Sequence, residues 1–393
     1  MTGGPHRELP PTDLRSLRTE RIRRLLLVAA SCVFALALFE APALFNIVNY
    51  GTLIGREFPL WASGNATDPE LLHIHRPYSH LRGSTLGGNI VMEYRVPQFD
   101  LTQYQWDAAY DLHGFRNRSG LQRAGTVVIG DSFVEAMTVP DEAMMTSRLA
   151  RLQGDVVANL GQSGYGPQEE SLVLKRWGLA LQPRTVIWMF YEGNDLSDLL
   201  RYDAIVHHPP SFWRAYLGRS FVNNLRRLLL SRLKPSGERV SGVLPARDGA
   251  AMKVYFAGMD ATSSLRLDAT HLRAVEETVG IVETARSLAA AQSARLVFVF
   301  IPDKFRVFRQ VCQFPPQSML FKREVSDLPD RLRRAVESMP PGVGFLDLTP
   351  ALIASARAGG LPYYRDDSHW SEEGNRVAAD AVYAYLSSNQ ADR

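Results

Sequence analysis

The chain contains little cysteine and almost no net charge. Cys32 and Cys312 are the only two cysteines among 393 residues, and Cys32 lies in an apolar run, so we expect no internal disulfide. The formal net charge is +3, and the six arginines and three acidic residues of positions 1–24 account for all of it. The rest of the chain is neutral, which excludes a global field that would attract nucleic acid. We therefore expect no nucleic-acid partner.

Metal-ligand patterns are also lacking. Two groups of histidines come into question, the trio His73, His75 and His80 and the pair His207 and His208. No cysteine or acidic cluster accompanies them at ligand spacing. The sequence thus predicts no metal site, and it gives no sign of a cofactor.

A long apolar run lies near the N-terminus. Residues 25–39 carry no charge, and after Glu40 the apolar character continues to Val48. Because about 20 residues are needed to cross a bilayer, we predict one transmembrane anchor at residues 23–46, with Glu40 near the outer interface. The alternative is a cleaved signal peptide, since Ala41-Pro42-Ala43 fits an A-x-A cleavage site.

The flanking charges predict the orientation of this anchor. Arginines crowd the tail at residues 1–24, whereas Arg56 is the first basic residue beyond the run. Such a bias keeps the basic side in the cytoplasm. We expect a single-pass protein of a bacterial inner membrane, with the bulk of the chain facing the periplasm or the exterior.

Beyond the anchor the sequence divides into two parts. Residues 47–110 are punctuated by glycine and proline and predict an irregular lead-in segment, whereas residues 111–393 predict an α/β domain. Strands are expected near residues 125–130, 155–160, 184–191, 295–301 and 344–348. The chain between the third strand and the next helical pattern exceeds an ordinary connection, which predicts an insertion at about residues 203–265.

One part of this insertion has an unusual composition. Residues 211–234 combine aromatic residues and leucines with six basic residues and no acidic residue, which is typical of a basic amphipathic helix. Three interpretations stay open. The helix rests on anionic lipid headgroups, covers a binding crevice, or packs as an ordinary surface helix.

Ser132 and His369 carry the strongest chemical signal. Ser132 lies in TVVIGDSFVEA, where a β-branched run enters Gly130-Asp131 and a helical pattern follows. A strand-to-helix turn of this kind exposes reactive side chains at the end of a parallel sheet. A serine hydroxyl becomes a nucleophile only when an oriented base takes its proton. His369 can be that base, and Asp366, three residues earlier, can orient it.

Two further strands end in glycine-marked polar turns. One runs into Gly161-Gln162-Ser163-Gly164 and the other into Gly193-Asn194-Asp195. Loops after neighbouring parallel strands converge on one crevice. The N–H groups of Ser132 and Gly164 and the amide of Asn194 are then expected to form an oxyanion hole. Taken singly, each of these residues also fits an ordinary capping or turn role.

Together, the four blocks resemble the SGNH (GDSL-type) serine hydrolases. Ser132 in GDSF, Gly164 in NLGQSGYG, Asn194 in EGND and His369 in DDSH occur in the family's order, over roughly residues 110 to 388. The resemblance implies a three-layer, flavodoxin-like α/β/α sandwich with a five-stranded parallel sheet, and a Ser-His-Asp mechanism without a metal.

The chain departs from the common family pattern at two places. Tyr191 and Glu192 put a phenol and a carboxylate beside the oxyanion asparagine, which predicts an unusual substrate preference. The last block offers two acids, Asp366 at the Asp-x-x-His spacing and Asp367 at the Asp-x-His spacing of some exopolysaccharide-modifying relatives. We expect Asp366 to be the orienting carboxylate, and Asp367 stays the alternative.

These observations lead to one functional hypothesis with three alternatives. The chain is expected to be a membrane-anchored serine esterase that removes or transfers an O-acyl group, in the first place O-acetyl, on envelope or exported polysaccharide. The alternatives are an O-acetyltransferase with the same triad, a lipase or lysophospholipase, and a non-catalytic carbohydrate-binding scaffold. The expected partners are an acylated carbohydrate or lipid substrate, and the membrane through the N-terminal helix.

Overall fold

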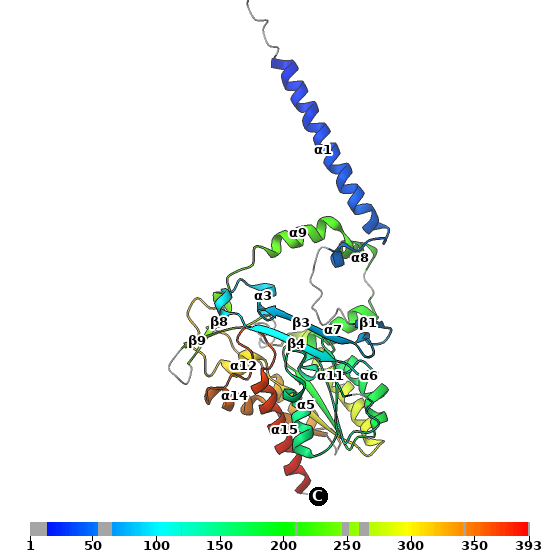
Figure 1. Cartoon of the computed structure of the whole chain (residues 1–393), viewed down its shortest axis with the longest axis vertical. Helices are drawn as coiled ribbons and strands as arrows, with labels where there is room; N and C mark the ends of the chain where they lie inside the picture. Colours follow the sequence, from blue (N-terminus) through cyan, green and yellow to red (C-terminus); the bar gives the residue numbers. More distant parts are fainter. Residues whose placement is uncertain are drawn as a thin grey trace, which may run out of the picture. The chain divides into compact units, whose positions relative to one another are not determined.

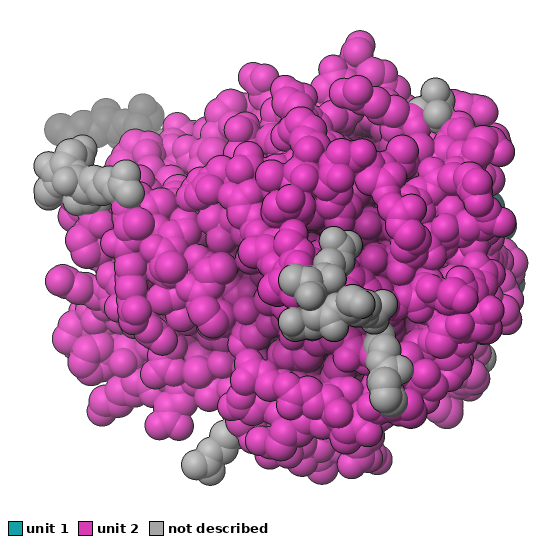
Figure 2. Space-filling model, turned by 90° about the horizontal axis from the view of Figure 1, so that it is seen from below, with its two compact units in different colours: residues 1–57, 210–232 teal, residues 58–209, 233–393 magenta. Residues whose placement is uncertain are grey.

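The computed structural model describes residues 14–53, 65–118, 120–208, 211–245, 251–258, 267–340 and 343–391. It comprises two compact units. Unit 1 contains residues 1–57 and 210–232, and unit 2 contains residues 58–209 and 233–393. Figure 2 shows one face of unit 2 in magenta.

The elements follow one another along the chain as Figure 1 shows. The strands are β1 (Asn65–Asp68), β2 (Leu72–His75), β3 (His80–Leu86), β4 (Gln103–Ala109), β5 (Thr126–Gly130), β6 (Val157–Gly161), β7 (Thr185–Tyr191), β8 (Ser241–Pro245), β9 (Ala251–Tyr255), β10 (Arg295–Ile301) and β11 (Val343–Asp347). The helices are α1 (Leu14–Leu44), α2 (Tyr50–Leu53), α3 (Ile90–Glu93), α4 (Ser132–Glu135), α5 (Met145–Gln153), α6 (Pro167–Val173), α7 (Asp195–Val206), α8 (Phe212–Arg219), α9 (Phe221–Ser231), α11 (Ala269–Ala290), α12 (Lys304–Phe308), α13 (Leu328–Glu337), α14 (Thr349–Arg357) and α15 (Glu372–Ala391).

A five-stranded parallel sheet forms the centre of unit 2. Its strand order is β11-β10-β7-β5-β6, and the pairs are parallel throughout. Counted within this sheet, the order is 2-1-3-4-5, which is that of the flavodoxin-like fold. The predicted fold class is therefore confirmed, and the five predicted strands lie where the apolar runs placed them.

Successive side chains of the buried strands pack alternately against the two helical layers. Ile187 and Met189 of β7 face a core that α5, α12, α14 and α15 cover. Val186 and Trp188 face the opposite core, which α6, α7, α11 and α13 cover. Successive side chains of a strand point to opposite faces, so a strand that is apolar throughout is buried on both sides.

The lead-in was expected to be irregular, and the structure corrects this. Residues 65–109 contain two antiparallel pairs, β1 with β2 and β3 with β4. In β4, buried residues alternate with exposed ones, as in a sheet with one solvated face. Most exposed positions of these strands are polar, so the sequence shows no apolar run there.

Buried polar contacts tie the lead-in to the sheet domain. Glu135 of α4 accepts hydrogen bonds from His75 Nε2 at 2.9 Å, from the Tyr110 hydroxyl at 2.5 Å and from the Ser163 N–H at 2.6 Å. Burial by itself raises the pKa of Glu135, but the hydrogen bond and charge of His75, with those of Ser163 and Tyr110, outweigh it and lower the pKa to about 2. This carboxylate joins the two parts of the unit.

Unit 1 is built around one long helix. Over Arg18–Leu44, α1 is long and apolar enough to cross a membrane, and none of its apolar window is buried within the protein. The helices α8 and α9 contact α1, and α2 contacts α8 and α9. The insertion thus contributes residues 210–232 to the N-terminal unit, a grouping that the predicted domain boundaries did not contain.

The Glu135 site predicts an acid-sensitive contribution to stability. Its pKa is about 2 in the folded chain and near 4.5 when unfolded, so the stabilisation is present above pH 4.5 and is lost as the pH falls toward 2. Glu135→Gln is expected to lower the unfolding free energy at pH 7 by about 3 kcal/mol, with a deficit that shrinks as the pH approaches 2. Urea unfolding across this range measures it. Exposed Glu142→Gln is the control, and a deficit that is equal at all pH values would contradict the assignment.

Candidate active site

Ser132 lies at the first turn of α4, directly after β5. The side chain of Asp131 accepts the N–H of Phe133 at 2.9 Å and so caps this short helix. Ser132 is thereby free of the capping role that a serine commonly takes at this position. Close approach of β6 is possible because Gly161 has no side chain, and a Cβ there would lie 2.4 Å from the Glu135 nitrogen.

His369 contacts Ser132 across 237 positions of sequence. The distance from Ser132 Oγ to His369 Nε2 is 2.8 Å, and the other ring nitrogen, Nδ1, lies 2.5 Å from Asp367 Oδ1. About a third of the His369 side chain is exposed, whereas Asp367 is largely buried. The three side chains form a continuous hydrogen-bonded chain of the kind that activates a serine.

The carboxylate in this chain is Asp367, so the expectation that Asp366 contacts His369 is wrong. Asp367 Oδ1 also accepts the backbone N–H of His369 at 2.8 Å. This local turn, in which an aspartate bonds the backbone two residues on, brings the carboxylate to the imidazole. Asp366 lies elsewhere and accepts the Tyr104 hydroxyl at 2.7 Å and the Thr102 N–H at 2.8 Å.

Two residues that the sequence did not single out, Asn89 and Lys304, hold the Asp367 turn. The Asn89 N–H donates to Asp367 Oδ2 at 2.7 Å, and the Asn89 side chain bonds Ser368. Lys304, which is fully buried, donates from Nζ to the carbonyl oxygens of Asp367 at 3.0 Å, Arg365 at 3.1 Å and Tyr255 at 2.5 Å. No local pattern indicates these roles, because the partners lie tens to hundreds of positions away.

The pKa of Asp367 follows from these contacts. Burial raises it, but the charge of His369, the hydrogen bonds from its ring and backbone, and the Asn89 N–H leave the pKa below its usual value. Asp367 therefore stays ionised when His369 takes up a proton. An ionised carboxylate at Nδ1 stabilises the imidazolium.

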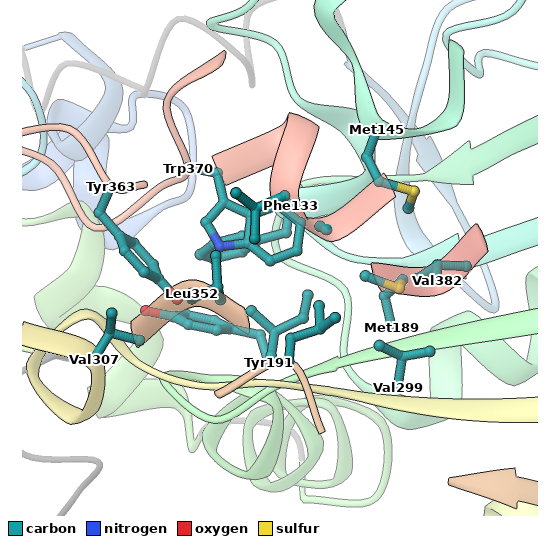
Figure 3. Close-up of a cluster of buried hydrophobic side chains, with 14 of the residues drawn as sticks. Phe133, Met145, Met189, Tyr191, Val299, Val307, Leu352, Tyr363, Trp370 and Val382 are labelled. Carbon is teal, nitrogen blue, oxygen red and sulfur yellow. The ribbon is translucent and has the colours of Figure 1, made fainter. Parts of the chain in front are cut away.

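An aromatic cluster lies against the imidazole of His369, and Figure 3 shows its members Phe133, Trp370 and Tyr191. Phe133 follows Ser132, Trp370 follows His369, and their rings meet edge to face with centroids 5.0 Å apart. Phe133 also contacts the His369 ring at 5.2 Å and the Tyr191 ring at 4.2 Å. Aromatic pairs in such geometry contribute to stability beyond their buried area. Here they join the two segments of the chain that carry Ser132 and His369.

Tyr191 and Glu192, expected beside the site, are both buried in the core. Glu192 forms a buried ion pair with Arg306, with Nε donating at 2.7 Å, and accepts the Asp303 N–H at 3.0 Å. The structure therefore gives no support to the idea that these two residues set an unusual substrate preference.

The predicted oxyanion residues follow three adjacent strands. Ser132 follows β5, Gly164 lies beyond β6 with φ +80°, a conformation that favours glycine, and Asn194 follows β7. The Asn194 amide donates to Asp198 Oδ2 at 2.7 Å and also hydrogen bonds to Asp131. The amide is thus oriented by two carboxyl groups, and its oxyanion role stays a prediction.

Several carboxyl groups are buried around Asn194. Burial raises the pKa of Asp131 and that of Glu170 and Asp195 well above the usual values. Burial likewise raises the pKa of Asp198 to about 6 and that of Glu169 to about 7. Like charges this close cannot all ionise, so part of the cluster is protonated at neutral pH.

Four of the five histidines singled out in the sequence have protein partners. His73 Nε2 lies 2.9 Å from the Ser163 carbonyl, His75 bonds Glu135 and His80 bonds Asp107. His207 Nδ1 lies 2.8 Å from Asp203. Among the described residues no cluster of three or more His, Cys, Asp or Glu has a geometry suited to a metal ion.

A family comparison gives a match for the C-terminal third of the chain. Residues 261–392 match the family described as "SGNH hydrolase-like domain, acetyltransferase AlgX". The matched range includes His369 and both aspartates and begins after Ser132. The predicted resemblance is confirmed, since this part of the chain is similar to the SGNH hydrolase-like family.

Comparison with solved structures gives distant similarities. A GDSL-like lipase from Bacteroides thetaiotaomicron is 11% identical, with 68% of this chain and 89% of that chain covered and a TM-score of 0.35. The acetyl xylan esterase AlAXEase is 10% identical, with 66% and 98% covered and a TM-score of 0.36. The acetyl xylan esterase Est2A from Butyrivibrio proteoclasticus is 9% identical, with 74% and 71% covered and a TM-score of 0.33. No curated protein matches the chain.

The buried carboxyl cluster predicts a stability that falls as the pH rises. Glu169 has a pKa of about 7 in the folded chain and near 4.5 when unfolded, so its contribution is lost as the pH rises through 7. Glu169→Gln is expected to raise the unfolding free energy at pH 8 by about 2 to 3 kcal/mol and to change it little at pH 4.5. Urea unfolding at both values tests this, with exposed Glu276→Gln as control. A variant that is less stable at pH 8 would contradict the burial argument.

Proposed function

We propose that the chain is an SGNH-type serine enzyme that moves acyl groups through an acyl-serine intermediate. The observation that carries the proposal is the chain of contacts from Ser132 Oγ through His369 to Asp367. In this proposal Ser132 is the nucleophile, His369 the general base and then acid, and Asp367 the orienting carboxylate.

The reaction proceeds in two halves. Ser132 Oγ attacks the ester carbonyl carbon while its proton passes to His369 Nε2. The tetrahedral intermediate then collapses, the C–O bond to the alcohol breaks, and Nε2 returns the proton to the leaving oxygen. Water or a sugar hydroxyl, deprotonated by Nε2, attacks the acyl-serine, and Ser132 leaves with the proton.

The oxyanion of the intermediate needs donors beside Ser132. We assign this role to the N–H groups of Ser132 and Gly164 and to the Asn194 amide. Because Asp131 adjoins Ser132, the amide N–H that contacts Asp131 in the free protein is the one that turns to the oxyanion. Such donors act on charge that develops only during the reaction.

The proposed substrate is an O-acyl group, in the first place O-acetyl, on an envelope or exported polysaccharide. Two observations support it. The family description names an acetyltransferase, and the chain carries a helix that meets the length and composition of a membrane span. Transfer to a sugar hydroxyl and hydrolysis by water share the acyl-serine, so the acceptor distinguishes them.

We also infer that α1 is retained as an anchor, with residues 1–24 in the cytoplasm and the catalytic domain in the periplasm. Glu40 supports this inference, since it accepts hydrogen bonds from the Tyr216 and Ser220 hydroxyls, each at 2.8 Å. Cleavage after Ala43 would remove these contacts. Edman sequencing or the intact mass of the membrane-extracted protein tests the inference, and an N-terminus at Leu44 would overturn it.

A fluorophosphonate tests the nucleophile. The reagent is expected to label the wild type on Ser132, and Ser132→Ala and His369→Ala are each expected to lose about 10³-fold or more in turnover of p-nitrophenyl acetate, because the triad acts as a unit. Peptide mass spectrometry locates the label. Labelling at another serine, or none on folded wild type, would contradict the proposal and favour a non-catalytic scaffold.

A substrate panel then separates the enzyme classes. Acetylated oligosaccharides, short esters and long-chain phospholipids are compared as donors, with and without an unacetylated oligosaccharide as acceptor. Acetyl appearing on the acceptor identifies a transferase, and free acetate alone identifies an esterase. Turnover of only the long-chain lipid would contradict the carbohydrate substrate.

The two neighbouring aspartates provide a matched pair. Asp367→Asn is expected to lower kcat by roughly 10² to 10⁴, because an amide at Nδ1 favours the wrong imidazole tautomer. Asp366→Asn keeps the triad and removes an acceptor of Tyr104 and Thr102, so it is expected to lose about 1 to 3 kcal/mol of stability with kcat largely kept. Kinetics and thermal unfolding of both variants test this. The reverse pattern would return the triad carboxylate to Asp366.

A further inference from the structure

An acidic residue of α1 organises the insertion in unit 1. Glu40 Oε1 accepts the Ser220 hydroxyl at 2.8 Å and the Val222 N–H at 2.6 Å, and Oε2 accepts the Tyr216 hydroxyl at 2.8 Å. Val222 lies in the first turn of α9, where N–H groups lack intrahelical partners. A carboxylate inside an apolar run therefore caps a helix from a distant part of the sequence.

Apolar and backbone contacts reinforce this junction. The ring of Phe221 stacks on Phe39 with centroids 4.8 Å apart and meets Tyr50 edge to face at 5.2 Å. Arg219 Nε donates to the Ala43 carbonyl at 3.3 Å, and Ala43 is fully buried. The helices α8 and α9 are thus fixed to the last turns of α1, and Figure 1 shows α9 running across the axis of α1.

The outer surface of these two helices is apolar. One side of α9 contacts α1, yet side chains elsewhere on α8 and α9 are 45% to 66% exposed. These are Phe212, Trp213, Leu217, Val222, Leu229 and Leu230. Trp213 packs only against its neighbours Phe212 and Tyr216 among the ring contacts of the described residues. Large exposed apolar side chains gathered in this way mark an interaction surface.

Basic residues accompany these apolar side chains. Residues 211–232 contain five arginines and no acidic residue, and Arg214, Arg226, Arg227 and Arg232 are exposed. A helix with exposed aromatic and leucine side chains and arginines lies in the interface of an anionic bilayer. The charge therefore favours a lipid surface over an uncharged partner.

The position of α8 and α9 along α1 agrees with binding to a lipid surface. At 1.5 Å per residue, the helix from Leu25 to Leu44 spans about 30 Å, the thickness of a hydrocarbon core. Phe39, Glu40 and Ala43, which hold α8 and α9, then lie within about 8 Å of the outer interface. The tryptophan and tyrosine of α8 belong to the residue types enriched there.

We propose that α8 and α9 form an interfacial platform that binds anionic lipid headgroups at the outer end of α1. The proposal rests on the retention of α1 as an anchor and is independent of the catalytic assignment. Glu40 joins the platform to the span, the aromatic and leucine side chains enter the interface, and the exposed arginines contact lipid phosphates.

Tryptophan quenching in proteoliposomes tests the platform. Full-length protein, whose intact mass verifies residues 1–43, is reconstituted into phosphatidylcholine with and without phosphatidylglycerol, and lipids brominated on the acyl chain serve as quenchers. The Trp213 signal is the difference between wild type and Trp213→Phe. We expect brominated lipid to quench it and aqueous iodide to leave it largely unchanged, with stronger lipid quenching when phosphatidylglycerol is present.

Charge-reversal variants distinguish binding of α8 and α9 to lipid from binding to another partner. The double variant Arg226→Glu/Arg227→Glu is expected to lose roughly half or more of the gain from phosphatidylglycerol, whereas Arg273→Glu, an exposed arginine of α11, is expected to keep it. Full access of iodide to Trp213 in both lipid mixtures would overturn the proposal. Protection of Trp213 from iodide that appears only with a bound phosphonate would also overturn it, because it indicates a lid. Protection that appears only at high protein density would overturn it as well, because it indicates contact with a second copy of the chain. The quenching measurements without phosphonate require no activity, so failure of the proposed chemistry is distinguishable.

Discussion

The packing of Phe133 against Trp370 is the contact on which the site depends. Each ring follows a reactive residue directly, Ser132 at the end of β5 and His369 before α15, and the imidazole lies against Phe133. A hydrogen bond alone contributes about 1 kcal/mol, which is little against the entropy of closing a loop of more than 200 residues. The buried aromatic cluster and the packing of α15 against α5 contribute to that closure, so the hydrogen bond between Ser132 and His369 sets the final geometry.

The lead-in segment supplies hydrogen-bond partners for buried carboxylates of the sheet domain. In this segment Asn89 donates a hydrogen bond to Asp367, Thr102 and Tyr104 donate to Asp366, and His75 hydrogen bonds to Glu135. Each contact satisfies a buried carboxylate, which is costly to leave unpaired. The two neighbouring aspartates therefore divide their roles, since Asp366 holds the lead-in while Asp367 turns back to His369. Behind them Lys304 satisfies three carbonyl oxygens of the same region.

The sequence was sufficient to predict the sheet and the pairing of Ser132 with His369. Strands buried on both faces appear as apolar runs, and the polar residues that end them mark one edge of the sheet. Asp367 was not predictable in this way, because the choice between two adjacent acids depends on residues some 260 to 280 positions upstream. The lead-in strands were not predicted for a different reason: their exposed faces are mostly polar, so they form no apolar run. The cap that Glu40 provides to α9 likewise depends on a contact across about 180 positions.

The account depends most on the bond between Asp367 and the imidazole. Proton NMR of the detergent-solubilised protein observes the low-field resonance of the His369 Nδ1–H directly. We predict that this resonance is present in wild type and in Asp366→Asn, and absent in His369→Ala and strongly shifted upfield in Asp367→Asn. A resonance that is unchanged in Asp367→Asn and lost in folded Asp366→Asn would contradict the account.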